Sequence, residues 1–247
     1  TKLIGHLEVA YGVRSEPRDS ITHELTAEQQ FRSLDPTLAP RPPVGVNLQG
    51  AFESLLDQLF THRWPGHPNF DTEIKGTLVR RLWPEVRAAI EAPQHRGPIA
   101  DAGMRKLIRS VVNPLRLGQM GETHLLVETN WQSHFAQQQA LDAQGGPLTV
   151  ARVRRWIDQP RPMGLPTELQ NLIILAWAQQ TNRRLLLNGG PCEAEVDRLA
   201  DEVELREQAL PALADWERAI KLAGELLGVV APQTLSAANV GKLVADV

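Results

Sequence analysis

The stretch that decides the fold is residues 145–191, GGPLTVARVRRWIDQPRPMGLPTELQNLIILAWAQQTNRRLLLNGGP. Thr149 is a suitable N-cap for a short helix with apolar residues on one side. The prolines and glycine at 160–164 predict a turn. Thr167 and Gln170 match a capping box, and the helix that they would begin is apolar on nearly every side. A helix of this kind is normally buried at the centre of a domain.

A small β element is expected directly after this helix. Residues 183–190, RRLLLNGG, predict a short strand that enters a turn at Asn188-Gly189. Over residues 108–191, three amphipathic or apolar helices lie between glycine and proline breaks and this strand-like run follows them, an order that suggests a winged-helix-like end near 183–190. The expected fold class is therefore mainly α, a multi-helix domain with this one small β element.

Four further helices are expected before this stretch. Apolar spacing predicts one from Leu48, a second over 74–90 that Pro84 should kink or split, and a third that Asp101 caps and Asn113-Pro114 stops. A fourth is expected to start near Thr123 and to end at the Gly-Gly-Pro of residues 145–147. Its buried face would hold Leu126, Trp131 and Phe135.

The composition changes after Cys192. Residues 193–217 hold nine acidic side chains against Arg198 and Arg206, and they carry a narrow apolar stripe formed by Val196, Leu199 and Val203. This pattern favours a helix or an arm that lies on a partner. Pro211 would start a further helix, and Ser236 would cap a final one that buries Val240, Leu243 and Val244.

The chain is expected to have three parts. Residues 1–45 would hold an N-terminal helix, with Leu3, Leu7 and Tyr11 on one face, and a proline-rich connector, DPTLAPRPPVG. Residues 46–190 would form the helical core with the winged-helix-like end. Residues 191–247 would hold the acidic helix and the C-terminal helices.

The bulk composition is that of a globular protein without a strong overall field. The 247 residues are 42% hydrophobic and 22% charged, with a net charge of −3, which excludes a general attraction to nucleic acid or anionic lipid. The longest apolar stretch, 169–178, is far shorter than the roughly 20 residues of a membrane span, so no membrane contact is expected. The single cysteine, Cys192, fits a cytoplasmic protein.

No motif for chemistry is complete. Gly241-Lys242 lacks the glycine pattern of a phosphate loop, and Cys192 has no histidine near it in sequence. The cluster of His62, His67, Asp71 and Glu73 lacks the spacing of a helical zinc site, although a loop site stays open. His124 and His134 would lie on one side of the fourth helix, where a structural role in burial or hydrogen bonding is favoured over acid–base catalysis. We therefore expect no enzyme activity, cofactor or metal in this segment.

Nucleic-acid binding is the strongest functional interpretation of single residues. Arginines gather over residues 78–116 and 150–188, and a winged-helix-like end could present five of them to phosphates: Arg152, Arg154, Arg155, Arg183 and Arg184. Two points oppose it. The helix at 167–180 is too apolar to lie in a groove of DNA, and the acidic residues after 192 could pair with these arginines internally.

Several motifs resemble those of a known family. They are Asn113-Pro114-Leu115, Gly118, Gly121-Glu122, His124, Trp131, His134-Phe135, HPNFD at 67–71, GGPLTVARVRRWID at 145–158, GLPTELQNLIILAWAQQTNR at 164–183 and LSAANVGKLVADV at 235–247. They look like the region beyond the ATPase in PglY-type proteins of the phage growth limitation (Pgl) and BREX defence systems. The resemblance covers residues 45–247. It implies a P-loop ATPase elsewhere in the parent protein and work in a multi-protein complex that blocks phage DNA replication, and it transfers no catalytic residue.

Taken together, these patterns predict a non-catalytic interaction region of a phage-defence ATPase, contacting other defence proteins or double-stranded DNA. Two alternatives stay open. One is a helical protein–protein scaffold without a nucleic-acid role, in which residues 193–247 hold a partner or a second copy. The other is a metal-dependent hydrolase that uses the histidines near 62–73.

Overall fold

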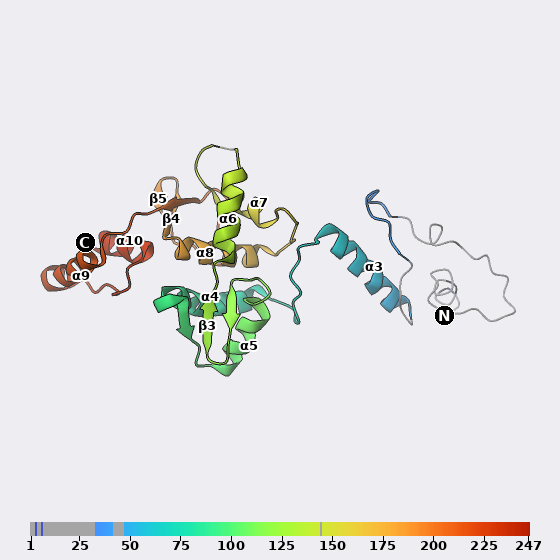
Figure 1. The fold of residues 1–247 in the computed structure, drawn as a ribbon, viewed down its shortest axis with the longest axis horizontal. Coiled ribbons are helices and arrows are strands. Elements are labelled where there is room, and N and C mark those ends of the chain that lie inside the picture. Colours follow the sequence, from blue (N-terminus) through green and yellow to red (C-terminus); the bar gives the residue numbers. More distant parts are fainter. Residues whose placement is uncertain (1–2, 4–5, 7–32, 42–46, 144) are drawn as a thin grey trace. The chain divides into compact units, whose positions relative to one another are not determined.

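A computed structural model describes residues 3, 6, 33–41, 47–143 and 145–247 (Figure 1). The N-terminal helix expected around Leu3, Leu7 and Tyr11 lies outside the described residues, as does part of the proline-rich connector. The described chain is mainly α-helical with two small three-stranded antiparallel sheets, which confirms the expected fold class. It divides into two compact units, residues 1–67 with 161–164, and residues 68–160 with 165–247.

The first unit contains helix α3, Leu48–Arg63. The Asn47 side chain caps it by accepting a hydrogen bond from the Gly50 amide at 2.8 Å. Trp64 follows at the C-cap and packs closely on Gly164, whose φ of +59° lies in the left-handed region that glycine tolerates. His67 Nδ1 lies 2.7 Å from the Met163 carbonyl oxygen, so the segment after α3 is bound to residues 161–164.

The second unit begins with a helix and sheet layer. Its elements are α4 (Gly76–Glu91), the 3-10 turn η1 (Pro93–His95), β1 (Arg96–Pro98), α5 (Ala102–Val111), β2 (Gly118–Met120) and β3 (His124–Val127). The sheet order is β1-β3-β2, with Arg96 opposite Leu126 and Gly118 opposite Val127. Gly97 packs directly against Ala89 of α4, and Asp101 caps α5 as predicted by accepting from the Met104 amide.

The expected position of the fourth helix is wrong. The fourth helix does not start near Thr123: residues 124–127 form strand β3, and α6 spans only Asn130–Leu141. In the strand, Leu126 points away from the core and is 47% exposed, and His124 does not share a helix face with His134. Pro84 does not split α4, which is continuous through it.

The centre of the second unit is α8, Thr167–Gln180, and it is buried along most of its length as predicted. Helices α4, α6 and α7 (Val150–Ile157) pack on it. Phe135 of α6 meets Trp177 of α8 edge-on, with 4.7 Å between ring centroids. The expected capping box is absent, because the helix begins after Pro166 and the side-chain amide of Gln170 donates to the Leu165 carbonyl oxygen instead.

The second sheet follows α8. The predicted strand is β4, Arg183–Leu187, and it turns at Asn188-Gly189 into β5, Gly190–Pro191. The sheet order is β5-β4-β6, where β6 is Glu204–Glu207, a strand that the sequence did not predict. The residues just before α7 also pair with β6, through Leu205 N to Leu148 O at 2.7 Å and a bridge between Thr149 and Glu204.

The helix expected over the acidic residues is absent from the structure, in which residues 192–207 are all described. Residues 192–203, here named the acidic loop, contain hydrogen-bonded turns but no helix, and they connect β5 to β6. A pair of helices ends the chain, α9 (Leu213–Leu227) and α10 (Ala237–Asp246). They share a small core around Trp216, Ala223 and Leu243, and Ser236 caps α10 as predicted, although Val244 is exposed.

Candidate interaction surface

Arg152, the first of the five predicted DNA-contacting arginines, is turned into the protein. Its side chain is 10% exposed, and its Nε lies 2.7 Å from Asp142 Oδ2. The guanidinium also lies over the Trp156 ring, 5.5 Å from the centroid. This arginine joins the end of α6 to α7 and is not placed to contact a phosphate.

Arg154 has a similar internal role beside α8. Its Nη2 donates to Asn171 Oδ1 at 2.7 Å and to the Leu199 carbonyl oxygen at 2.9 Å, and its Nε lies 3.1 Å from Asp201. Asn171, whose role was not predicted from the sequence, is fully buried and also donates through Nδ2 to the Val196 carbonyl oxygen at 2.7 Å. Together these two side chains hold the acidic loop against α7 and α8.

Arg183 is also enclosed, with 9% of its side chain exposed. Its guanidinium carbon lies 4.6 Å from the centroid of the Trp177 ring, and its Nη2 lies 2.5 Å from Glu207 on the neighbouring strand. Burial lowers the pKa of this guanidinium, while the charge of Glu207 and its hydrogen bond oppose that shift. Arg183 thus stabilises the β4–β6 pair.

The remaining two arginines differ in exposure. Arg155 on α7 is exposed, and Arg184 on β4 is half-buried close to Gly241 of α10. The structure therefore does not gather the five predicted residues on one exposed face. Three of them bind acidic side chains that come from three places: Asp142 after α6, Asp201 in the acidic loop and Glu207 in β6.

The acidic loop lies on the body of the unit through its apolar stripe. Val196, Leu199 and Val203 are all buried, so the stripe predicted for a partner is covered by the protein itself. Asp197 adds an ion pair with Arg80 of α4. The acidic side chains of Glu193, Glu195 and Glu202 remain exposed.

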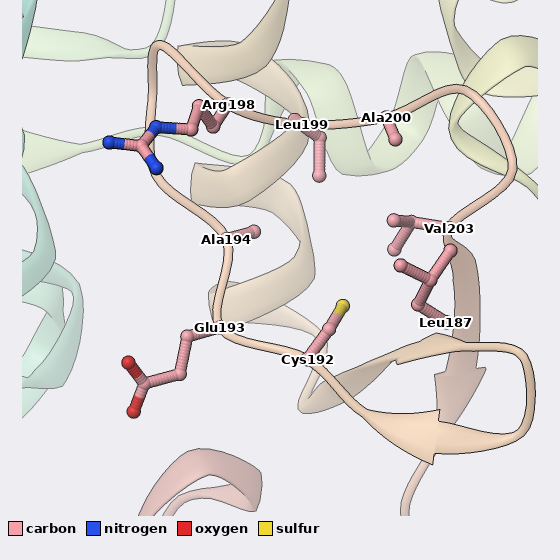
Figure 2. Close-up of a pocket in the computed structure, with 8 residues that line it drawn as sticks. All are labelled: Leu187, Cys192, Glu193, Ala194, Arg198, Leu199, Ala200 and Val203. Carbon is pink, nitrogen blue, oxygen red and sulfur yellow. The ribbon is translucent and has the colours of Figure 1, made fainter.

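One side of the acidic loop borders an open hollow of about 440 Å³ (Figure 2). Six apolar or small side chains line it, with two charged ones beside them: Leu187, Cys192, Ala194, Leu199, Ala200 and Val203, then Glu193 and Arg198. Figure 2 shows the Cys192 side chain pointing into this space. Burial raises the pKa of the Cys192 thiol above its ordinary value.

The histidines considered for chemistry make structural contacts. His134 Nε2 lies 2.7 Å from the Trp156 carbonyl oxygen, and His124 Nδ1 lies 2.9 Å from the Thr123 hydroxyl. In the first unit, His62 Nε2 lies 2.9 Å from the Thr37 hydroxyl. Within the described residues, no three His, Cys, Asp or Glu side chains converge as metal ligands would. No described helix combines the length and apolar composition that crossing a membrane requires.

Comparison with protein families defines the class of the chain. Residues 77–178 match the model of the BREX System ATPase PglY protein 5th domain, and residues 1–64 match that of the PglY fourth domain. Both domains belong to a protein of the BREX phage-defence system. The chain is a region of a PglY-type BREX protein, as its motifs suggested. No solved structure matches it.

Proposed function

We propose that this region is a non-catalytic interaction module through which the PglY-type protein contacts other proteins of its defence complex. The observation that carries the proposal is that three of the arginines predicted for DNA contact form ion pairs within the protein. Arg152, Arg154 and Arg183 are three of the five arginines predicted for DNA contact, and each is largely enclosed and paired with an acidic side chain. Arginines held in this way stabilise a scaffold and contribute little to phosphate binding.

We further propose that residues 130–207 form a winged-helix-like unit. Its chain order supports this: α6, the β-paired residues 148–149, α7, α8, β4 and β6 follow one another, and β6 lies between β4 and residues 148–149. In this arrangement α8 takes the place of a recognition helix and the acidic loop that of a wing. Since α8 is enclosed and the loop is acidic, the unit is better suited to proteins than to DNA.

Exposed apolar side chains on α9 support protein contact independently. Leu222 and Leu226 are 45% and 75% exposed, and Val230 beyond the helix is 91% exposed. They lie beside the face that packs on α10 through Trp216 and Ala223. We also propose a cytoplasmic location, which the free thiol of Cys192 supports because free thiols persist in reducing compartments.

Co-purification tests the protein-contact proposal. The tagged full-length PglY-type protein would be expressed with the other BREX proteins, either native or with one surface changed. One variant replaces Glu193, Glu195 and Glu202 by Lys, and the other replaces Leu222, Leu226 and Val230 by Ser. At least one of them should lose a BREX protein while its melting temperature stays near that of the native protein. An unchanged set of partners in both variants would count against the proposal.

DNA contact is the second candidate, since winged-helix-like units often bind DNA, Arg155 is exposed and Arg184 is partly exposed. It predicts binding to double-stranded DNA that falls steeply with salt and weakens when both residues become Glu. Replacement of Arg154 is a poor test of this role, because the loss of its internal contacts would disturb the acidic loop.

A further inference from the structure

The hollow beside the acidic loop has the size and lining of a binding site. Its volume of about 440 Å³ falls within the range of roughly 300–1,000 Å³ that is usual for sites that take a ligand or a partner's side chain. Leu199 and Val203 form part of its wall and are themselves buried, whereas Leu187 is 38% exposed and Ala200 is exposed. Part of the apolar lining is therefore open to an incoming group.

The hollow is lined by one acid and one arginine, and the acidic loop around it holds more acids than bases. Glu193 lines the hollow, and Glu195 and Glu202 lie next in sequence to the lining residues Ala194 and Val203. In the described residues these three carboxylates form no ion pair, while the loop's other two acids, Asp197 and Asp201, are paired with arginines of the body. Arg198 is the one basic residue of the loop and also lines the hollow.

We propose that this hollow receives an apolar side chain presented by a lysine- or arginine-rich segment of a partner protein. The inference rests on the proposed function, of which it specifies the partner's chemistry. The apolar wall supplies the binding free energy by removing the incoming side chain from water. The exposed carboxylates select basic flanking residues and speed their approach. The same carboxylates repel the phosphates of a nucleic acid, which argues against that occupant.

Cys192 makes the proposal measurable, because it is the only cysteine of the chain and its side chain points into the hollow (Figure 2). The probes are three short fluorescent peptides. One has a Leu-Phe pair flanked by lysines and arginines, the second has the same pair flanked by acids, and the third has alanines between basic residues. Binding to the whole chain is followed by anisotropy, and location by the rate at which N-ethylmaleimide alkylates Cys192.

The basic Leu-Phe peptide should bind tightest and slow the alkylation of Cys192 severalfold. Binding by the alanine peptide should be weaker by about tenfold or more, since it lacks the apolar group that enters the hollow. The acidic peptide should not protect Cys192. Equal protection by all three peptides, or none by the basic Leu-Phe peptide, would overturn the proposal. Stronger protection by a DNA duplex would assign the surface to nucleic acid and would also overturn it.

Two variants with a matched control keep the result specific. Ala194→Leu fills the hollow and should abolish binding of the basic Leu-Phe peptide. Ala219→Leu makes the same change on the exposed surface of α9 and should leave binding unaltered. Glu193→Lys should weaken the basic peptide and improve the acidic one. If Ala194→Leu binds as the native chain does, the hollow is not the site.

The peptide-binding test of the hollow can fail or succeed independently of the co-purification test of the proposed function. A hollow that binds no basic peptide, in a protein that still co-purifies with BREX proteins, would reject this inference and leave the interaction role in place. Loss of co-purification in the Leu222, Leu226 and Val230 variant alone would place the contact on α9 instead. Both results would contradict the hollow as the site of partner binding.

Discussion

At the residue scale, the contact that holds the acidic loop is a buried polar group. Asn171 is fully enclosed, and its side chain both donates to the loop at Val196 and accepts from Arg154. A buried amide is stable only when such partners are present, because burial without them costs free energy. One side chain of the central helix therefore contributes directly to holding the loop.

Replacing Asn171 by Ala should lower the free energy of unfolding by about 2–3 kcal/mol, since the Val196 carbonyl and the Arg154 guanidinium each lose a buried partner. Urea denaturation measures the loss, and hydrogen exchange should show faster exchange around residues 196–200. Gln137→Ala, on the exposed side of α6, is the matched control. A loss no greater than that of the control would show that the amide does not hold the loop.

The Cys192 thiol should titrate above its ordinary pKa, because burial disfavours the thiolate. The sign for stability follows from this: the contribution is present below the ordinary pKa and is lost as the pH rises through the folded pKa. Alkylation rates across pH should therefore rise later for the native chain than for the urea-unfolded chain. Coincident profiles, or an earlier rise in the native chain, would contradict the burial of this thiol.

Among single residues, the sequence predicted helix caps well and internal partners poorly. Asp101, Thr149 and Ser236 all cap helices as expected, because a cap depends on residues only three positions apart. The prediction that Thr167 caps α8 was wrong, because the N-cap position is taken by Pro166, whose backbone is extended. The partners of Arg154 and Arg183 lie 17 to 47 residues away, so local spacing could not reveal which acids would bind them.

At the element scale, the layer of α4 with the first sheet depends on close approach at Gly97. A Cβ atom at this position would lie 2.7 Å from Ala89 Cα and 2.9 Å from Ala89 Cβ, distances that real contacts do not reach. Strand β1 can therefore pack on α4 only with glycine here. The sheet and the helix would otherwise have to separate.

Gly97→Ala should destabilise the protein by about 1–3 kcal/mol, the usual cost of overpacking a tight contact. Thermal or urea unfolding measures it. Gly121→Ala is the control, because its Cβ would meet only the His124 carbonyl oxygen, at an ordinary 3.5 Å. Equal stability of the two variants would contradict the close packing of β1 on α4.

Long helices were predictable from the sequence, whereas the short strands were not. The apolar period of α8 extends over several turns and identifies both the helix and its burial. Strands β1, β2 and β3 have three or four residues each, too few to show the alternation of apolar and polar residues that is typical of a strand. The apolar spacing around Leu126 therefore predicts a helix instead. Strand β6 has three charged residues among its four, which is also typical of a solvent-exposed helix. Its pairing with β4 is set only by the tertiary fold.

At the scale of the whole molecule, arginines of the body form ion pairs with acidic residues of the same chain. Its net charge is only −3, and the arginines of α4, α7 and β4 pair with acids of residues 193–207. The internal-pairing alternative raised by the sequence therefore describes three arginines, Arg80, Arg154 and Arg183. The acidic side chains that remain exposed beside the hollow give the molecule a surface suited to basic protein segments.

The measurement that tests the central claim most directly is an anisotropy titration of the whole chain at low salt, with a labelled DNA duplex in one series and the basic Leu-Phe peptide in the other. A protein-contacting module predicts saturable peptide binding that Ala194→Leu removes. It also predicts DNA binding that is weak and unchanged when Arg155 and Arg184 become Glu. Tight DNA binding that falls steeply with salt and is lost in that double variant, with no peptide binding, would contradict the claim.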